Sequence, residues 1–193
     1  RGDHATVRAV IAEAPCEVWT YGRGQEWDGR VESCDHQAGT MRFTVLREGA
    51  PVGTFTSRLV GEHNLYNQVA AVAALTREGI TVAQLQKGFE SFQGIRRRQE
   101  VRGEPGGVTV VDDFAHHPTA VSVTLDALRM RFGPRRLWVV FEPRTNTSKQ
   151  KFFQEAYTKV FHQADRVIIA APGDQSRIEE DNRMDSETLA EGL

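Results

Sequence analysis

The sequence predicts an α/β chain made of two units. Residues 1–98 are expected to form a β-meander followed by two helices, and residues 99–193 a partial Rossmann-like unit built on parallel strands. Three observations carry this prediction. Apolar and polar residues alternate between positions 41 and 57, apolar residues take up helical spacing after Leu65, and strands alternate with helices beyond position 99. The last pattern is typical of a parallel sheet covered by helices.

Composition and charge exclude several classes of function. The chain has 193 residues, of which 39% are hydrophobic and 26% charged, and a net charge of −2, so no nucleic-acid partner is expected. No apolar run approaches the roughly 20 residues that span a bilayer, so no membrane is expected either. Cys16 and Cys34 are too few for a disulfide scaffold and lack a zinc-binding spacing. Free thiols in a reducing cytoplasm are therefore expected.

Short strands are expected to open the first unit. Residues 6–12 (TVRAVIA) and 17–22 (EVWTYG) are apolar enough to form two of them. Residues 41–57 predict a hairpin, because Met41, Phe43 and Val45 alternate with polar residues and EGAPVG supplies a turn.

Two helices are predicted to follow this hairpin. Leu65, Val69 and Val72 keep helical spacing up to Gly79, which suits the C-terminal end of a helix. The second helix begins after Thr81, which forms a capping-box pattern with Gln84. Its apolar stripe consists of Val82, Leu85, Phe89 and Phe92.

The second unit is predicted to alternate strands and helices. Strands are expected at residues 107–111 (GVTVV), 136–141 (RLWVVF) and 166–171 (RVIIAA). Pro118 opens a helix that Gly133 ends, and residues 149–163 predict a further helix. Because a stable doubly wound sheet has about five or six strands, this sheet is expected to be incomplete.

Polar loops follow each of the three expected strands. They are residues 112–119 (DDFAHHPT), 141–149 (FEPRTNTSK) and 171–177 (APGDQSR). Ligands of parallel α/β sheets collect at the carboxyl ends of the strands, so the three loops predict one binding rim. Asp112 and Asp113 suit sugar hydroxyls there.

A metal site within the first of these loops is disfavoured. Adjacent residues such as His116 and His117 seldom both reach one ion, and the chain has no helical pair of histidines at i and i+4. His117 stands directly before Pro118, so a place at the start of a helix is the alternative interpretation.

Two further stretches carry candidate ligand-binding residues. His63 and Asn67 share one face at a helix start, where Asn64 either caps the helix or, with them, contacts a purine or phosphate. Residues 96–98, a run of three arginines, form either a solvated face or a clamp for a ribose-phosphate or an acidic substrate. No phosphate-binding GxxxxGK[ST] or GxGxxG pattern is present to grip β- and γ-phosphates.

Four stretches, in their order and spacing, resemble the Mur ligases, the ATP-dependent amide-forming enzymes of bacterial cell-wall synthesis. They are GEHNLYNQVAAVAAL (61–75), RRRQEVRG (96–103), DDFAHHPTAV (112–121) and FEPRTNTSK (141–149). The residues at positions 114–115 and 144–147 are most similar to those of the branch that recycles murein peptides. The branch that adds L-alanine typically has the sequences DDYGHHP and PHRYTR in these two stretches. The resemblance extends from about residue 18 to residue 171.

The resemblance implies that the chain is a fragment, which covers the end of the central ATPase domain (1–98) and most of the C-terminal Mur ligase domain (99–193). ATP and Mg²⁺ are implied as cofactors. The P-loop, the magnesium ligands and the UDP-binding domain of the family are expected before Arg1, and no metal ligand is expected in this sequence. The fragment alone is therefore expected to be inactive.

The whole enzyme, by resemblance, would join UDP-N-acetylmuramate to the recycled tripeptide L-Ala-γ-D-Glu-meso-diaminopimelate through an acyl phosphate. A fragment of the L-alanine-adding ligase is one alternative, and a non-catalytic α/β nucleotide-binding module is another.

The resemblance also implies roles for individual residues. It places His63, Asn64 and Asn67 by the adenine, and Arg98 and Asp113 at the ribose and phosphates. Candidates to orient the tripeptide are His116, His117, Arg144 and Lys149. Arg and Lys suit this task because they pair with carboxylates. No catalytic residue is assigned within the chain.

Overall fold

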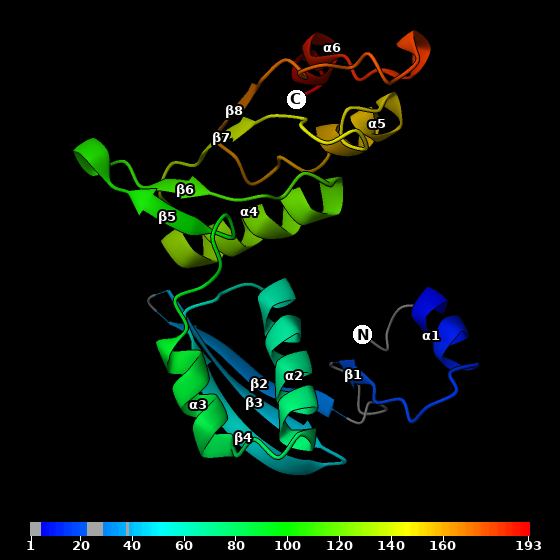
Figure 1. The fold of residues 1–193 in the computed structure, drawn as a ribbon. Helices are drawn as coiled ribbons and strands as arrows, with labels where there is room; N and C mark the ends of the chain where they lie inside the picture. Colours follow the sequence, from blue (N-terminus) through cyan, green and yellow to red (C-terminus); the bar gives the residue numbers. More distant parts are fainter. Residues whose placement is uncertain (1–4, 23–28, 38) are drawn as a thin grey trace. The chain divides into compact units, whose positions relative to one another are not determined.

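A computed structural model describes residues 5–22, 29–37 and 39–193 of the chain (Figure 1). The chain divides into two compact units, Arg1–Gly94 and Ile95–Leu193, called here the N-terminal and C-terminal units. Both mix helices with strands, which confirms the predicted α/β class. Within the described ranges, no helix has the length and apolar character needed to cross a membrane.

The N-terminal unit is a four-stranded sheet with helices on one face. Its elements are α1 (Ala5–Ile11), β1 (Tyr21–Gly22), β2 (Gly29–Gln37), β3 (Thr40–Arg47), β4 (Ala50–Ser57), α2 (Glu62–Arg77) and α3 (Val82–Ser91). The strands follow the order β1-β2-β3-β4. Apolar side chains of β3 and β4, such as Phe43 and Phe55, pack against Leu65 and Val69 of α2 and Leu85 of α3.

The hairpin predicted for residues 41–57 is confirmed. Met41, Phe43 and Val45 are buried on one face of β3, and Phe43 pairs with Phe55 of β4. The turn is tighter than the six residues predicted. Only Glu48 and Gly49, both with positive φ, connect the strands, and the residues after Gly49 already belong to β4. A two-residue connection with positive φ fits the twist of paired antiparallel strands.

The two predicted helices of this unit are also confirmed. Leu65, Val69 and Val72 form the buried side of α2, and Gly79, with a φ of 83°, follows its end. The hydroxyl of Thr81 accepts from the backbone of Gln84, whose side chain accepts from the backbone of Thr81, so α3 begins with the predicted capping box. Phe92, predicted for the stripe of α3, instead lies past its last residue and is 40% exposed.

The strand predicted at residues 6–12 is wrong. Residues 5–11 form α1, which has no buried residue. A short apolar run fits either a helix or a strand, and a helix satisfies its backbone hydrogen bonds without a partner strand. Of residues 17–22, only Tyr21 and Gly22 form a strand, and β1 pairs in parallel with β2.

The C-terminal unit has two small sheets and a long central helix. Its strands and α-helices are β5 (Glu100–Gly103), β6 (Val110–Asp112), α4 (Pro118–Phe132), β7 (Trp138–Phe141), α5 (Gln154–Thr158), β8 (Arg166–Ile169) and α6 (Ser186–Glu191). Short 3₁₀ turns occupy Pro105–Gly107, Lys151–Phe153 and Glu180–Asn182. The core joins Leu125 of α4 to Phe141 of β7, Tyr157 of α5 and Leu189 of α6.

The predicted three-stranded parallel sheet is correct only in part. β7 and β8 are parallel neighbours, as expected, but β6 pairs antiparallel with β5 and is not hydrogen-bonded to β7. The tight Pro105–Gly107 turn, in which both glycines have positive φ, brings β5 and β6 together. This local pairing closes a far shorter loop than the crossover between β6 and β7. Val110 of β6 is 44% exposed.

The helix predicted for residues 149–163 is shorter than expected. It consists of the 3₁₀ turn Lys151–Phe153 and of α5, which ends at Thr158. Lys149 instead ends a turn, in which its backbone N–H donates to the carbonyl of Thr145, and Gln150 is extended. The carbonyl of Lys149 accepts from the backbone N–H of Met184, and Gln150 forms a β-bridge with Arg183. This pairing with distant residues overrides the local helical pattern.

Candidate functional site

The loop after β6 is hydrogen-bonded to the segment that carries the arginine run. We call residues 112–117 the aspartate loop and residues 95–99 the arginine loop; both belong to the C-terminal unit. The carboxylate of Asp113 accepts from the backbone N–H of Gln99 (2.8 Å) and of Ala115 (2.7 Å). The backbone N–H of Phe114 donates to the carbonyl of Arg97 (2.8 Å). Two predicted site stretches therefore lie side by side.

Arg98 is exposed in the arginine loop, as are its neighbours Arg96 and Arg97. Its guanidinium lies 5.8 Å from the ring centre of Phe114, and among the described residues it makes no hydrogen bond or ion pair. The guanidinium of Arg97 is closer to that ring (4.8 Å) and also lies 3.9 Å from the carboxylate of Asp112. Arg98 therefore remains available to an external anion, whereas Arg97 is engaged within the loops.

The two histidines of the aspartate loop point to different neighbours. Nδ1 of His116 lies 2.8 Å from the carbonyl of Phe114, and the carbonyl of His116 accepts from the hydroxyl of Tyr157. Burial raises the pKa of Tyr157 to about 12, so this donor keeps its proton. His117 precedes the first residue of α4, as predicted, and its ring packs edge-on against Phe153 at 4.9 Å.

No magnesium site is apparent in these loops. Across residues 5–22, 29–37 and 39–193, no group of three His, Cys, Asp or Glu side chains could hold a metal ion. The described residues therefore offer no set of ligands for the Mg²⁺ that the family resemblance implies, whose ligands are expected before Arg1.

The loops after β7 and β8 also meet in the C-terminal unit. Lys149 is only 8% exposed, and its ammonium donates to the carbonyl of Asp174 (2.7 Å). The pKa of the Asp174 carboxyl is lowered, first by a hydrogen bond from the backbone of Ser176. Arg144, in contrast, is exposed and has no hydrogen bond or ion pair to any described residue. The rim therefore presents one buried, engaged cation and one available cation.

The predicted residues of the N-terminal unit lie in the first turns of α2. One interpretation of the sequence made Asn64 the cap of this helix, and this is wrong. The N-cap residue is Gly61, and Nδ2 of Asn64 donates to the carbonyl of Val60 (2.8 Å). Asn67 is exposed and His63 is half-buried one turn before it. Sequence analysis missed Gln68, which is buried and donates to the carbonyls of Asn64 and Leu59.

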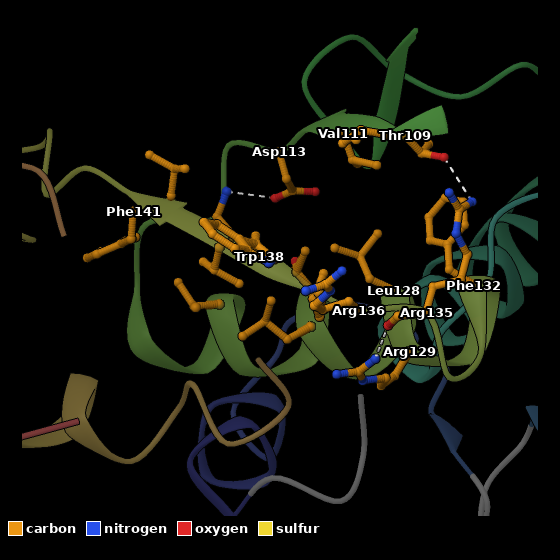
Figure 2. Close-up of a pocket in the computed structure, with 18 of the residues that line it drawn as sticks. Thr109, Val111, Asp113, Leu128, Arg129, Phe132, Arg135, Arg136, Trp138 and Phe141 are labelled. Carbon is orange, nitrogen blue, oxygen red and sulfur yellow. Dashed lines mark hydrogen bonds between the residues drawn. The ribbon is translucent and has the colours of Figure 1, made fainter. Parts of the chain in front are cut away.

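A cavity of about 800 Å³ lies between β6, α4 and β7 (Figure 2). Asp113 is the only predicted site residue on its wall, which is mostly apolar and includes Leu128, Trp138 and Phe141. Arg135, at the far end, is held by Thr109 (2.9 Å). The cavity therefore suits the phosphates and sugar of a nucleotide poorly, and we place the candidate site at the exposed loops instead.

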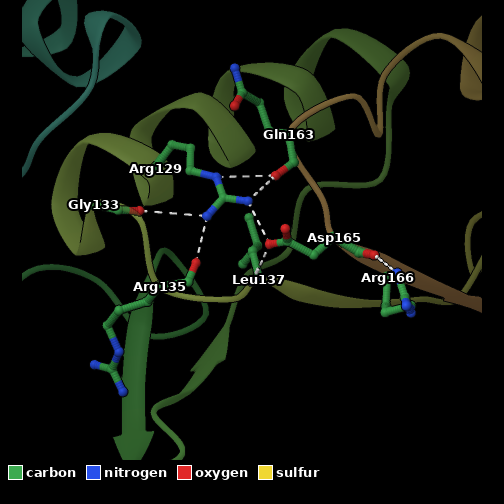
Figure 3. Close-up of polar contacts among 7 residues, drawn as sticks. All are labelled: Arg129, Gly133, Arg135, Leu137, Gln163, Asp165 and Arg166. Carbon is green, nitrogen blue, oxygen red and sulfur yellow. Dashed lines mark hydrogen bonds and ion pairs between the residues drawn. The ribbon is translucent and has the colours of Figure 1, made fainter.

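A polar network at the end of α4 was not foreseen from the sequence (Figure 3). The guanidinium of Arg129 donates to the carbonyl of Gln163 (2.6 Å) and pairs with the carboxylate of Asp165 (2.7 Å). Asp165 also accepts from the backbone N–H of Leu137 (2.7 Å). The pKa of the Asp165 carboxyl is lowered, first by this bond and then by the bond from Arg129. The network fastens the segments that precede β7 and β8.

Comparison with protein families gives a match over the C-terminal half of the chain. Residues 97–193 match the family described as "Mur ligase, glutamate ligase domain". The UDP-N-acetylmuramate–L-alanine ligase of Salinibacter ruber is 36% identical over 167 residues, which are 86% of this chain and 35% of that protein. The chain thus spans about a third of the length of such relatives.

Two solved structures are also similar. The UDP-N-acetylmuramate–alanine ligase of Thermotoga maritima matches 83% of this chain and 35% of its own, with a TM-score of 0.70. At 21% identity it shows the fold alone. A murein peptide ligase from Psychrobacter arcticus is 29% identical and matches 86% of this chain and 35% of its own, with a TM-score of 0.58.

Proposed function

Because the chain belongs to the Mur ligase family, whose members are ATP-dependent ligases, we propose that it contributes binding residues to an enzyme that forms an amide on UDP-N-acetylmuramate. The observation that carries this proposal is the family match over residues 97–193, which includes the braced arginine and aspartate loops. Since the match covers only 35% of such a relative, the activity is proposed for a ligase of that length that contains this chain.

Arg98 and Asp113 are the proposed contacts to the ribose and phosphates of ATP. The guanidinium of Arg98 is exposed and available, and guanidinium groups bind phosphate oxygens with two parallel hydrogen bonds. Asp113 already accepts two backbone hydrogen bonds, but an ionised carboxylate has about four acceptor positions, so it can still accept from a sugar hydroxyl. His63, Asn64 and Asn67 remain the proposed neighbours of the adenine.

The proposed reaction passes through an acyl phosphate. The γ-phosphoryl group of ATP moves to the lactyl carboxylate of UDP-N-acetylmuramate, which leaves ADP. The amine of the second substrate then attacks the acyl carbon, loses a proton and expels inorganic phosphate, so that an amide bond remains. Positioning and charge neutralisation supply most of the catalysis in such phosphoryl transfers. The side chains of this chain are proposed to bind and orient the substrates, and none is assigned as the base.

L-alanine is the first candidate for the amine substrate. Several UDP-N-acetylmuramate–L-alanine ligases are relatives at 31–36% identity, and they favour L-alanine over the tripeptide that the loop sequences suggested. The tripeptide L-Ala-γ-D-Glu-meso-diaminopimelate is the second candidate. Phe114 and Ala115 in the aspartate loop, and the 29% identity to the murein peptide ligase of Psychrobacter arcticus, support it.

Arg144 is the proposed partner for the carboxylate of the amine substrate. Both candidate amines carry a carboxylate, and Arg144 is a cation that no described residue engages. Lys149, His116 and His117 stay candidates for the same substrate, but their side chains contact other residues of the chain. The test of the proposed function is ATP-dependent coupling of an amine to UDP-N-acetylmuramate by the ligase that contains this chain.

A further inference from the structure

The backbone on either side of Arg98 has a conformation that residues other than glycine rarely adopt. Arg97 has a φ of 58° and Gln99 a φ of 47°. Residues of this kind persist where the surrounding structure holds them, and they concentrate at functional sites. Arg97 is held at both ends: its N–H donates to Oε2 of Glu100 (2.9 Å), and its carbonyl accepts from Phe114 (2.8 Å).

Gln99 is held at both ends as well. Its N–H donates to Oδ2 of Asp113 (2.8 Å), and its carbonyl accepts from the guanidinium of Arg131 (3.1 Å). The loop therefore fixes the backbone before and after Arg98 and leaves the side chain of Arg98 available. A bracing pattern of this kind fits the presentation of one side chain to a ligand.

Among these partners, Arg131 alone comes from a long helix. Glu100, Asp113 and Phe114 belong to or adjoin the two loops, whereas Arg131 lies in α4, which packs in the core of the C-terminal unit. Arg131 is half-buried, and within the part of the chain that the structure describes its guanidinium donates to the carbonyl of Gln99 alone. It thus ties the strained loop to the rigid part of the unit.

We propose that Arg131 is a positioning residue for nucleotide binding: it holds the carbonyl of Gln99 and thereby fixes the guanidinium of Arg98 for the phosphates of ATP. This inference rests on the proposed function, in which Arg98 contacts ATP. Arg131 does not itself touch the nucleotide. It acts through Arg98, and this indirect action separates it from a residue that only stabilises the fold.

The test is a double-mutant cycle on the ligase that contains this chain, with the dissociation constant for ATP measured by calorimetry. Arg131→Met should weaken ATP binding by roughly tenfold, the typical effect of losing one hydrogen bond to a charged group. In an Arg98→Met background the same change should weaken binding by less than about twofold, because the residue through which Arg131 acts is gone. Equal weakening in both backgrounds, or none in the first, overturns the proposal.

Arg129→Met is the matched control. It removes a guanidinium from the same helix, but Arg129 bonds to Gln163 and Asp165 rather than to the arginine loop. It should lower thermal stability and leave the dissociation constant for ATP within about twofold of the wild type. A loss of ATP affinity equal to that of Arg131→Met would show a general charge effect and would contradict the proposal.

Hydrogen exchange supplies a second readout that needs no nucleotide. In Arg131→Met the backbone amide of Gln99 should exchange at least about tenfold faster, while Arg98→Met should leave it unchanged. Should Arg131→Met fail to fold, Arg131→Gln serves in both measurements with the same expected directions. If the wild-type ligase does not bind ATP, the proposed function is overturned, and the inference with it. If the wild type binds ATP but Arg131→Met changes neither the exchange of the Gln99 amide nor the affinity for ATP, the inference alone is overturned.

Discussion

The carboxylate of Asp113 and the backbone N–H of Gln99 form a hydrogen bond of 2.8 Å that joins the aspartate loop to the arginine loop. The other carboxylate oxygen of Asp113 accepts from Ala115 (2.7 Å). Asp113 is thus part of the scaffold of the proposed nucleotide site as well as a proposed contact to the ribose. A change at this residue should affect both binding and stability.

In the ligase that contains this chain, Asp113→Ala should raise the KM for ATP and also lower the melting temperature. Loss of a charge-assisted hydrogen bond costs about 1.5–3 kcal/mol, which corresponds to roughly 10- to 150-fold in affinity. Asp112→Ala is the control, because the carboxylate of Asp112 lies 3.9 Å from the guanidinium of Arg97 and does not accept the hydrogen bonds from Gln99 and Ala115. An unchanged KM for ATP in Asp113→Ala, with a lower melting temperature, would make Asp113 a purely structural residue.

Arg144→Lys should raise the KM for the amine substrate and leave the KM for ATP nearly constant. The reason is that a guanidinium binds a carboxylate with two parallel hydrogen bonds, which an ammonium cannot reproduce. Steady-state kinetics with each substrate varied in turn measure the two constants. Arg136→Lys makes the same exchange at another exposed arginine, beside the cavity, and should change neither constant. If Arg144→Lys leaves the amine KM unchanged, Arg144 lies outside the substrate site.

Lys149→Met should destabilise the C-terminal unit. The ammonium of Lys149 is buried and donates to the carbonyl of Asp174, so the substitution removes this hydrogen bond from the carbonyl. A lost hydrogen bond of this kind costs about 1–3 kcal/mol. Chemical denaturation measures the difference, and Lys151→Met, at an exposed neighbouring lysine, should have almost no effect. Equal stability of wild type and Lys149→Met would contradict this assignment.

The ion pair between Arg129 and Asp165 should make stability depend on pH. The pKa of Asp165 is lowered in the folded state, first by the hydrogen bond from Leu137 and then by Arg129. Its contribution is therefore fully present above the unfolded pKa of about 3.9 and is lost as the pH falls through the lower folded pKa. Asp165→Asn lacks this contribution.

Melting temperatures of wild type and Asp165→Asn between pH 7 and pH 3 test this expectation. Wild type should be the more stable protein at pH 7, and the difference should shrink below about pH 4. A difference that stays constant over this range would show that the carboxylate of Asp165 adds nothing through its charge.

Local patterns in the sequence predicted much of the fold. Alternation at Met41, Phe43 and Val45 fixed one face of the hairpin, and Thr81 with Gln84 marked the start of α3. These signals work because they depend on residues that are close in the chain. The strand predicted at residues 6–12 was wrong because a short apolar run has no such periodicity. The helix predicted to begin at Lys149 was wrong there because the backbone of Lys149 pairs with a segment over 30 residues away.

Sequence patterns named the candidate residues of the site but not the hydrogen bonds between them. The polar stretch after β6 pointed to Asp113, but no local pattern revealed its bond to Gln99, 14 residues earlier. The left-handed backbone at Arg97 and Gln99 is equally invisible in the sequence, because neither residue is glycine. Arg129 and Asp165 are 36 residues apart and meet only through the packing of α4 against β7 and β8.

We propose that this chain serves an ATP-dependent ligase that acts on UDP-N-acetylmuramate. The most direct measurement supplies that ligase with ATP, UDP-N-acetylmuramate and either L-alanine or L-Ala-γ-D-Glu-meso-diaminopimelate, and follows ADP release and the mass of the nucleotide product. We expect one ADP for each amide formed, with L-alanine as the preferred amine. Preference for the tripeptide would select the second candidate, and the absence of any amide product with either amine would overturn the proposed function.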